Sequence, residues 1–378
     1  MENSTKLPHV KELDGLRGLL ASWVAFSHVL LWAGFASLKM PHQIQIGWET
    51  VIFSMPAVET FIILSGFAIS FLLHSRQHSY WAFMRGRFFR IYPVYLVCLI
   101  LGACTIGLTA MIHPLWQSPT AEMMRKISES ERNHFLAHAL SHLSLLNGLI
   151  PTKLLRDATG TFLPPGWSIT LEWQYYLVAP FIARWVQSSG RLLALGGLAY
   201  LGEEVAYHWQ NPHPAFLPAQ LPLFLVGIGS YHFYAHVCTT SESRSPRHAL
   251  PVAAFGCAAM VLSRHSVALL IWALAFGSFL VEAPGFVGRG LGLVRRILLH
   301  RWLQGLGRIS YPLYLVHWPV IVLCFYLLGR WKPGIGPNQT AAWMLLVAPP
   351  LFLAASVGLH RWVEAPFMIL GRGKAKCV

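Results

Sequence analysis

Long apolar runs, separated by short polar segments, repeat along almost the whole of this 378-residue chain. Runs of about 17 to 25 residues have the length that an α-helix needs to cross a bilayer. We therefore expect an all-α, polytopic membrane bundle of about ten helices. The expected spans are 16–38, 51–74, 92–113, 167–184, 192–208, 214–234, 249–263, 266–287, 309–328 and 341–361.

The basic residues between these runs favour one orientation. With a cytoplasmic N-terminus, most of the 29 Lys and Arg residues fall on the inner side, as the positive-inside rule requires. Both termini are then cytoplasmic, and 362–378 is a short inner tail. Because topology explains the net charge of +14, we expect no nucleic-acid partner.

The segment 134–150 is the main alternative in this topology, because it is apolar enough for an eleventh span. Making it span would place the arginine-rich segment 289–308 outside. We therefore prefer a helix in the outer interface, within a long outer loop over 114–166. His134, His138 and His142 recur there every four residues. We interpret them as the polar stripe of that amphipathic helix rather than as metal ligands, and predict no metal site.

Composition favours a single integral domain over 1–378, with no appended soluble domain. The chain is 55% hydrophobic and 12% charged, with a mean hydropathy of +0.50, whereas an average soluble domain is about 25% charged. No cleavage pattern precedes the first run, which should remain as the first helix. The six cysteines show no CxxC spacing and indicate neither a disulfide nor a metal.

Ionisable residues inside the runs are the first functional candidates, because burying a charge in hydrocarbon costs about 2.5 to 3.5 kcal/mol. Asp14, Arg17 and His28 share one helix face in "LDGLRGLLASWVAFSH". Arg17 and His28 lie about 16 Å apart along that helix. Small residues between them would admit a neighbouring helix or a thin ligand: Gly18, Ala21 and Ala25. An ordinary Asp14–Arg17 ion pair with a packing role for His28 is the alternative reading.

Further polar groups at similar depth should either converge inside the bundle or serve helix packing. They are Glu59, Ser65, Gly66, Glu172 and His317.

An arginine cluster occupies the second expected inner loop, "RGRFFRIYP", with Arg85, Arg87 and Arg90. The planar guanidinium suits phosphate, although positive-inside bias and anionic lipid would also explain the cluster. A phosphate-rich group at the inner face, with a neutral histidine deep in the membrane, has the shape of a coenzyme A thioester.

These motifs resemble acyltransferase family 3, the bacterial membrane-integral O-acyltransferases that modify cell-surface and secreted glycans, lipids and antibiotics. The matching stretches, in the family's order, are "LDGLRGLLASWVAFSH", "VETFIILSGFAIS", "RGRFFRIYPVY", "WSITLEWQYYLVAP", "LGRISYPLYLVHWPV" and "RWVEAPF". The departures are Ala57, where glycine is usual, and Ile62, where a second phenylalanine is usual.

The resemblance implies that Arg17 and His28 are an essential pair and that His28 is the catalytic base. It also implies that Arg85, Arg87 and Arg90 face the acyl-CoA phosphates. We expect Glu172 or Asp14 to orient the His28 ring. The supporting residues are Glu59, Ser65, Gly66, Trp167, Ser168, Tyr311, Tyr314 and His317.

The expected reaction transfers an acyl group, usually acetyl, from cytoplasmic acyl-CoA to a hydroxyl of a cell-surface glycan or lipid. Acyl-CoA is a co-substrate, no cofactor is bound permanently, and the enzyme belongs in the bacterial inner membrane. Transfer is either direct or through a covalent intermediate on Ser65. The rival interpretations are a transporter or flippase for a glycan, lipid or acyl donor, and a non-catalytic partner in glycan assembly.

Overall fold

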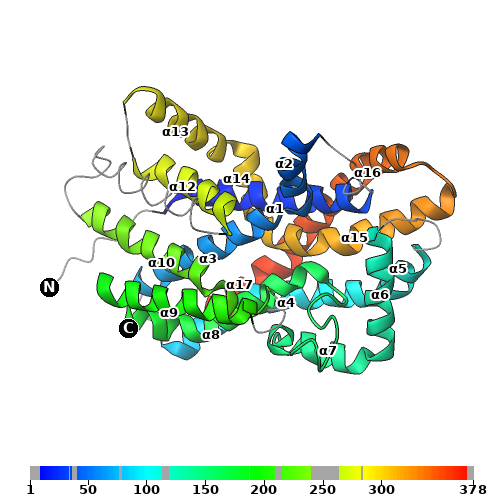
Figure 1. The fold of residues 1–378 in the computed structure, drawn as a ribbon, viewed down its shortest axis with the longest axis horizontal. Coiled ribbons are helices and arrows are strands. Elements are labelled where there is room, and N and C mark those ends of the chain that lie inside the picture. Colours follow the sequence, from blue (N-terminus) through cyan, green and yellow to red (C-terminus); the bar gives the residue numbers. More distant parts are fainter. Residues whose placement is uncertain are drawn as a thin grey trace.

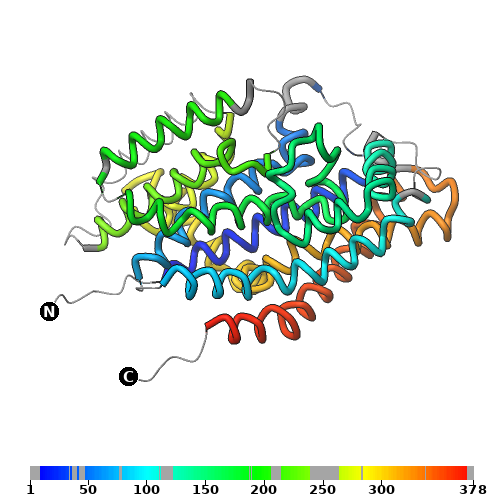
Figure 2. Tube along the Cα trace, turned by 90° about the horizontal axis from the view of Figure 1, so that it is seen from below, coloured from blue at the N-terminus to red at the C-terminus, as the bar shows by residue number. Residues whose placement is uncertain are grey.

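The computed structural model describes residues 9–33, 35, 41–75, 79–112, 119–186, 188–208, 214–239, 264–281 and 284–372. Within these residues the regular structure is helical and no strand occurs, which confirms the all-α prediction. Figures 1 and 2 show an elongated bundle with its longest helices side by side.

Six stretches of the described residues are long and apolar enough to cross a membrane. They are α1 (Lys11–Trp32), α3 (Met55–Ser75), α4 (Tyr80–Cys104), α10 (Leu217–Thr239), α15 (Ser310–Trp331) and Asn338–Arg372. The last joins α16 (Pro337–Leu359) and α17 (Ala365–Arg372) through a π-helical turn, His360–Glu364. A seventh candidate is the pair α12 (Ser266–Leu280) and α13 (Gly285–Leu298), which is bent by 97°.

The expected spans agree with the helices in most places. The helices α8 (Trp167–Trp185) and α9 (Ser189–His208) also coincide with expected spans, although they are not among the six. The expected span 249–263 lies outside the described residues. The number ten and the cytoplasmic placement of the termini therefore stay predictions.

The arginine motif was assigned to the wrong element. It is the first half of α4, not an inner loop, because this helix begins at Tyr80 rather than near residue 92. Ser79 caps the helix by accepting the Ala82 N–H at 3.3 Å. The expected span 92–113 also breaks at Thr105, after which α5 (Ile106–Ile112) begins. Likewise, the span expected to reach residue 287 ends at Leu280.

Several short helices complete the fold between the expected spans, and one of them, α7 (Phe135–Leu143), lies where a helix was predicted over 134–150. The expected outer loop contains α6 (Pro119–Asn133) and α7, which gather with α5 at one end of the molecule (Figure 1). Another short helix, α2 (His42–Phe53), precedes α3. An expected inner loop contains α13 and α14 (Arg301–Arg308).

Of the three histidines in the predicted polar stripe, His138 and His142 lie on α7 and point into the protein, whereas His134, at the N-cap of α7, is exposed. His138 and His142 are fully buried, whereas Leu136 and Leu140 are 70% and 60% exposed. His142 contacts Thr161 and Tyr95 through hydrogen bonds of 2.9 and 3.0 Å. Burial lowers the pKa of His142 to about 3. His138 and His142 thus form part of the interior of the segment 119–166, and the apolar face of α7 is exposed.

Glycines permit two close helix crossings that shape the centre of the bundle. A Cβ at Gly18 would lie 2.4 Å from the Leu303 carbonyl oxygen, so α14 packs directly on α1. A Cβ at Gly66 would lie 2.2 Å from the Phe224 carbonyl oxygen, where α3 crosses α10. The small face of α1 therefore receives a neighbouring helix at Gly18, which was one of the two predicted uses.

Candidate functional site

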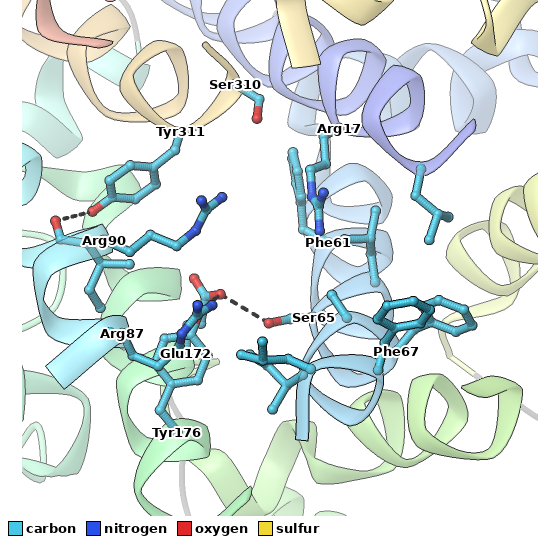
Figure 3. A pocket seen from close by; sticks show the side chains of 18 of the residues that line it. Arg17, Phe61, Ser65, Phe67, Arg87, Arg90, Glu172, Tyr176, Ser310 and Tyr311 are labelled. Atoms are coloured by element: carbon cyan, nitrogen blue, oxygen red, sulfur yellow. Dashed lines mark hydrogen bonds between the residues drawn. The ribbon is translucent and has the colours of Figure 1, made fainter. Parts of the chain in front are cut away.

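A cavity of about 960 Å³ lies between α1, α3, α4, α8, α15 and α17 (Figure 3). It follows α3 from Val58 to Ser75, a rise of about 25 Å. His9 and Arg372, near the two ends of the described chain, both line this cavity. This volume is at the upper end of the range of about 300 to 1,000 Å³ typical of small-molecule sites.

The cavity is strongly basic, mainly along its α4 side. Its guanidinium groups are those of Arg17, Arg85, Arg87, Arg90 and Arg372. Arg87 and Arg90 are three residues apart and so lie on one face of α4. Figure 3 shows Arg17, from α1, and Arg90, from α4, on opposite sides of the open space. All three arginines of the motif therefore line one cavity together with Arg17.

Arg17 forms the ion pair that the sequence suggested and still lines the cavity. Its Nη1 lies 3.1 Å from Asp14 Oδ1. Asp14 Oδ2 also lies 2.8 Å from His9 Nε2. Asp14 is not among the residues that line the cavity, so its structural role is to hold Arg17 at the wall.

The α4 arginines are only partly satisfied by protein groups. Arg87 Nε is buried and has no hydrogen-bond partner among the described residues. Its guanidinium lies 5.8 Å from the centroid of the Tyr176 ring. Arg90 Nη1 contacts the Met368 thioether sulfur at 3.7 Å, which is a weak acceptor. Because a buried unpaired donor is costly, an anionic ligand would stabilise this arrangement.

Glu172 is the one carboxylate among the described residues that line the cavity. It accepts hydrogen bonds from Ser65 Oγ, at 3.0 Å, and from the Tyr176 hydroxyl. Glu172 thus faces the arginines and balances part of their charge, and its described partners do not include His28.

His28 instead pairs with His317. His28 Nδ1 lies 2.7 Å from His317 Nε2, with the planes of the two rings at 20° and their centroids 5.0 Å apart. The Trp318 ring packs edge-to-face with His28, with a centroid distance of 5.5 Å. The prediction that Glu172 or Asp14 orients His28 is therefore wrong. A residue 289 positions along the chain does so.

The histidine pair lies just beyond the cavity rather than in its wall. Tyr314 and Ser168 line the cavity, and their hydroxyl oxygens are 2.9 Å apart. The Tyr314 ring lies 6.0 Å from that of Phe61, which places it towards the Val58 end of the cavity. The Tyr314 ring centroid is 6.3 Å from that of His317. Tyr314 therefore connects the arginine-lined space to the pair.

The remaining supporting residues have packing roles or lie elsewhere. Tyr311 lines the cavity and donates to the Ile91 carbonyl at 2.6 Å, which joins α15 to α4. Gly66 serves the α3–α10 crossing, and Trp167 begins α8 outside the cavity wall.

Glu59 was expected to converge on the site and does not. Its Oε1 lies 2.8 Å from His265 Nδ1, and His265 Nε2 lies 3.3 Å from Glu203. Burial disfavours the charged His265 ring, but the two carboxylates outweigh burial and raise the pKa of His265 to about 9. Glu59 thus belongs to a separate charged cluster that joins α3, α9 and α12.

Tyr176 and Arg372 are two polar lining residues that the sequence analysis did not assign to the site. Tyr176 stands one helical turn after Glu172, so the i, i+4 spacing could have indicated it. Arg372 was assigned to the inner tail, but it ends α17, whose Gly371 lies against Phe89 of α4. That contact has no local sequence signal.

A comparison with protein families supports the interpretation of these motifs. A family described as an acyltransferase domain matches residues 10–361. The match covers nearly the whole chain and confirms the resemblance noted from the motifs. No curated protein and no solved structure matches the chain.

Proposed function

The chain belongs to the acyltransferase family that matches its residues 10–361, and from this premise we propose that it is a membrane O-acyltransferase. The proposed donor is cytoplasmic acyl-CoA, with acetyl as the acyl group. The proposed acceptor is a hydroxyl of a cell-surface glycan or lipid, and the proposed location is the bacterial inner membrane. The observation that carries this proposal is the arginine-lined cavity that ends beside the His28–His317 pair.

In this proposal the coenzyme A phosphates bind the arginine side of the cavity. Among the described residues, the buried Arg87 Nε has no hydrogen-bond partner, and Arg90 Nη1 contacts the thioether sulfur of Met368. Phosphate oxygens would accept from both groups through charge-assisted hydrogen bonds. The opposite wall, on α3, is largely apolar, with Phe61, Ile62 and Phe67. It suits the neutral arm of the donor.

The thioester then lies at the Tyr314 end of the cavity. His28 removes the proton of the acceptor hydroxyl as the oxygen attacks the thioester carbonyl carbon, which is general-base catalysis. A hydroxyl of Tyr314 or Ser168 stabilises the negative charge that develops on the carbonyl oxygen. The carbon–sulfur bond breaks, the ester forms, and the coenzyme A thiolate takes the proton from His28.

The contacts of Ser65 favour direct transfer over a covalent intermediate on this residue. A nucleophilic serine needs an adjacent base to activate it. Ser65 Oγ donates to Glu172, which also accepts from Tyr176. The carboxylate oxygen that accepts from Ser65 is thus shared with Tyr176 and faces the arginines, and the described partners of Ser65 include no histidine. In this proposal Ser65 therefore holds Glu172 in place.

The test measures coenzyme A release by purified protein in nanodiscs supplied with radiolabelled acetyl-CoA and a lipid and glycan extract of the host membrane. Wild type should release coenzyme A and label an acceptor, and His28→Ala should do neither while retaining its thermal stability. The control is His134→Ala, an exposed histidine, which should behave as wild type. Unchanged turnover in His28→Ala, or transport of acetyl-CoA without transfer, would overturn the proposal.

A further inference from the structure

The hydrogen bonds of His317 determine which of its ring nitrogens carries a proton. His317 is fully buried, and its Nδ1 lies 3.0 Å from the Leu313 carbonyl oxygen. A carbonyl only accepts hydrogen bonds, so Nδ1 must be the protonated nitrogen. In a neutral ring, Nε2 then carries the lone pair.

The protonated nitrogen of His28 follows from that of His317 by the same reasoning. His317 Nε2 lies 2.7 Å from His28 Nδ1. Since His317 Nε2 accepts, His28 Nδ1 must donate, and His28 Nε2 is left with the lone pair. One chain of hydrogen bonds therefore runs from the Leu313 carbonyl through both rings and ends at His28 Nε2.

We propose that His317 is a positioning residue that fixes the tautomer of His28, so that Nε2 of His28 is the basic nitrogen. The role of His28 Nε2 as the catalytic base rests on the proposed acyl transfer. The tautomer of His28 follows from the hydrogen bonds alone. Aromatic packing holds the geometry, because Trp318 contacts both His28 and Trp32, with centroid distances of 5.5 and 5.7 Å.

The arrangement also stabilises His28 after it takes a proton. The acceptor O–H bond breaks, its proton goes to His28 Nε2, and its electron pair forms the new bond to the thioester carbon. The resulting imidazolium still donates through Nδ1 to His317 Nε2, now as a stronger, charge-assisted hydrogen bond. The departing thiolate later removes the Nε2 proton, so both rings return to their starting state. Tyr314, next to His317, is a further titratable side chain beside the pair.

Two substitutions at residue 317 separate the two halves of this chain of hydrogen bonds. In His317→Gln, the longer amide reaches the former Nε2 position and can still accept from His28. In His317→Asn, the shorter amide reaches only the former Nδ1 position and the Leu313 carbonyl. We expect His317→Asn to lower kcat by about 100-fold, the lower limit for loss of a general base. His317→Gln should retain at least a tenth of wild-type kcat, and KM for acetyl-CoA should be unchanged in both.

A direct readout of the tautomer does not depend on activity. Protein labelled with ¹⁵N-histidine in nanodiscs is measured by solid-state NMR, and His28→Ala identifies the His28 signals by their loss. Wild type and His317→Gln should show His28 protonated on Nδ1, and His317→Asn should show a mixture. A wild-type His28 protonated on Nε2, or an unchanged tautomer in His317→Asn, would overturn the inference. If the tautomer is as stated but no acyl transfer occurs, the proposed function fails and the assignment stands.

Discussion

Ser168, at the start of α8, and Tyr314, on α15, lie with their hydroxyl oxygens 2.9 Å apart at the end of the arginine-lined cavity. When Ser168 donates to Tyr314, the phenolic hydrogen is free to donate into the cavity. Tyr314 is also the lining residue whose ring contacts His317. These two residues therefore mark the place where donor and base would meet.

Replacing Tyr314 with phenylalanine should remove a stabilising donor to the thioester oxygen without changing the shape of the cavity. We expect kcat to fall by about 100-fold, the usual lower limit for losing one such donor, with an unchanged KM for acetyl-CoA. Coenzyme A release by protein in nanodiscs measures both constants. Tyr326→Phe, on the same helix, is the control and should match wild type. An equal loss in both variants would indicate a structural effect of removing a hydroxyl from α15.

Arg87→Gln should weaken donor binding specifically. A hydrogen bond to a charged group contributes about 1.5 to 3 kcal/mol, so Kd for coenzyme A should rise about 10- to 100-fold. Arg87→Lys should restore only part of the affinity, because an ammonium lacks the planar fork of the guanidinium. Calorimetry in nanodiscs gives the Kd values.

The control for Arg87 is Arg289→Gln, which removes an equal charge from an exposed position on α13. It should leave Kd unchanged. If both variants weakened binding equally, the arginines would act only through net charge, and the buried Nε of Arg87 would have no special role.

Much of the fold follows from apolar runs alone, because a helix in hydrocarbon must satisfy its own backbone. The predictions that failed concern features that depend on contacts between residues far apart in the sequence. The arginines of α4 were assigned to a loop because they interrupt an apolar run, yet the helix continues through them and directs Arg87 and Arg90 into a cavity. The partner of His28 lies 289 residues away. His317 was noted in the sequence, but no spacing could connect the two rings.

The α7 histidines illustrate a second kind of limit. Their spacing correctly indicated one polar helix face. In water that face would point outward, but beside a bilayer the apolar face can be the exposed one. The burial of His138 and His142 therefore depends on what surrounds the helix. The spacing of polar residues along the sequence does not give this information.

Gly66→Ala should destabilise the bundle at the α3–α10 crossing. The new Cβ would lie 2.2 Å from the Phe224 carbonyl oxygen, so the helices must separate. Overpacking of this kind costs about 1 to 3 kcal/mol, and the Tm in detergent should fall by several degrees. Gly196→Ala is the control, because a Cβ there meets no atom within 4 Å. A Tm for Gly66→Ala as high as that of the control would contradict the close crossing.

Glu131 on α6 should make the stability of the segment 119–166 depend on pH. It is buried and accepts the Phe162 N–H. Burial raises the pKa of Glu131 from 4.5 to about 7, although the Phe162 hydrogen bond acts in the opposite direction. The folded protein therefore binds this proton more tightly than the unfolded chain does. This contribution to stability increases as the pH falls from above 7 towards 4.5.

Glu131→Gln keeps an acceptor for Phe162 but cannot ionise, so the difference in Tm between variant and wild type isolates this one group from all others that titrate. The variant should be more stable than wild type at pH 8, by up to about 3 kcal/mol, and the advantage should shrink towards pH 5. Hydrogen exchange over 119–166 should show the same trend locally. Glu129→Gln, exposed on the same helix, should show no such pH-dependent difference. A constant difference in Tm across this range would mean that Glu131 is ionised in the folded protein throughout.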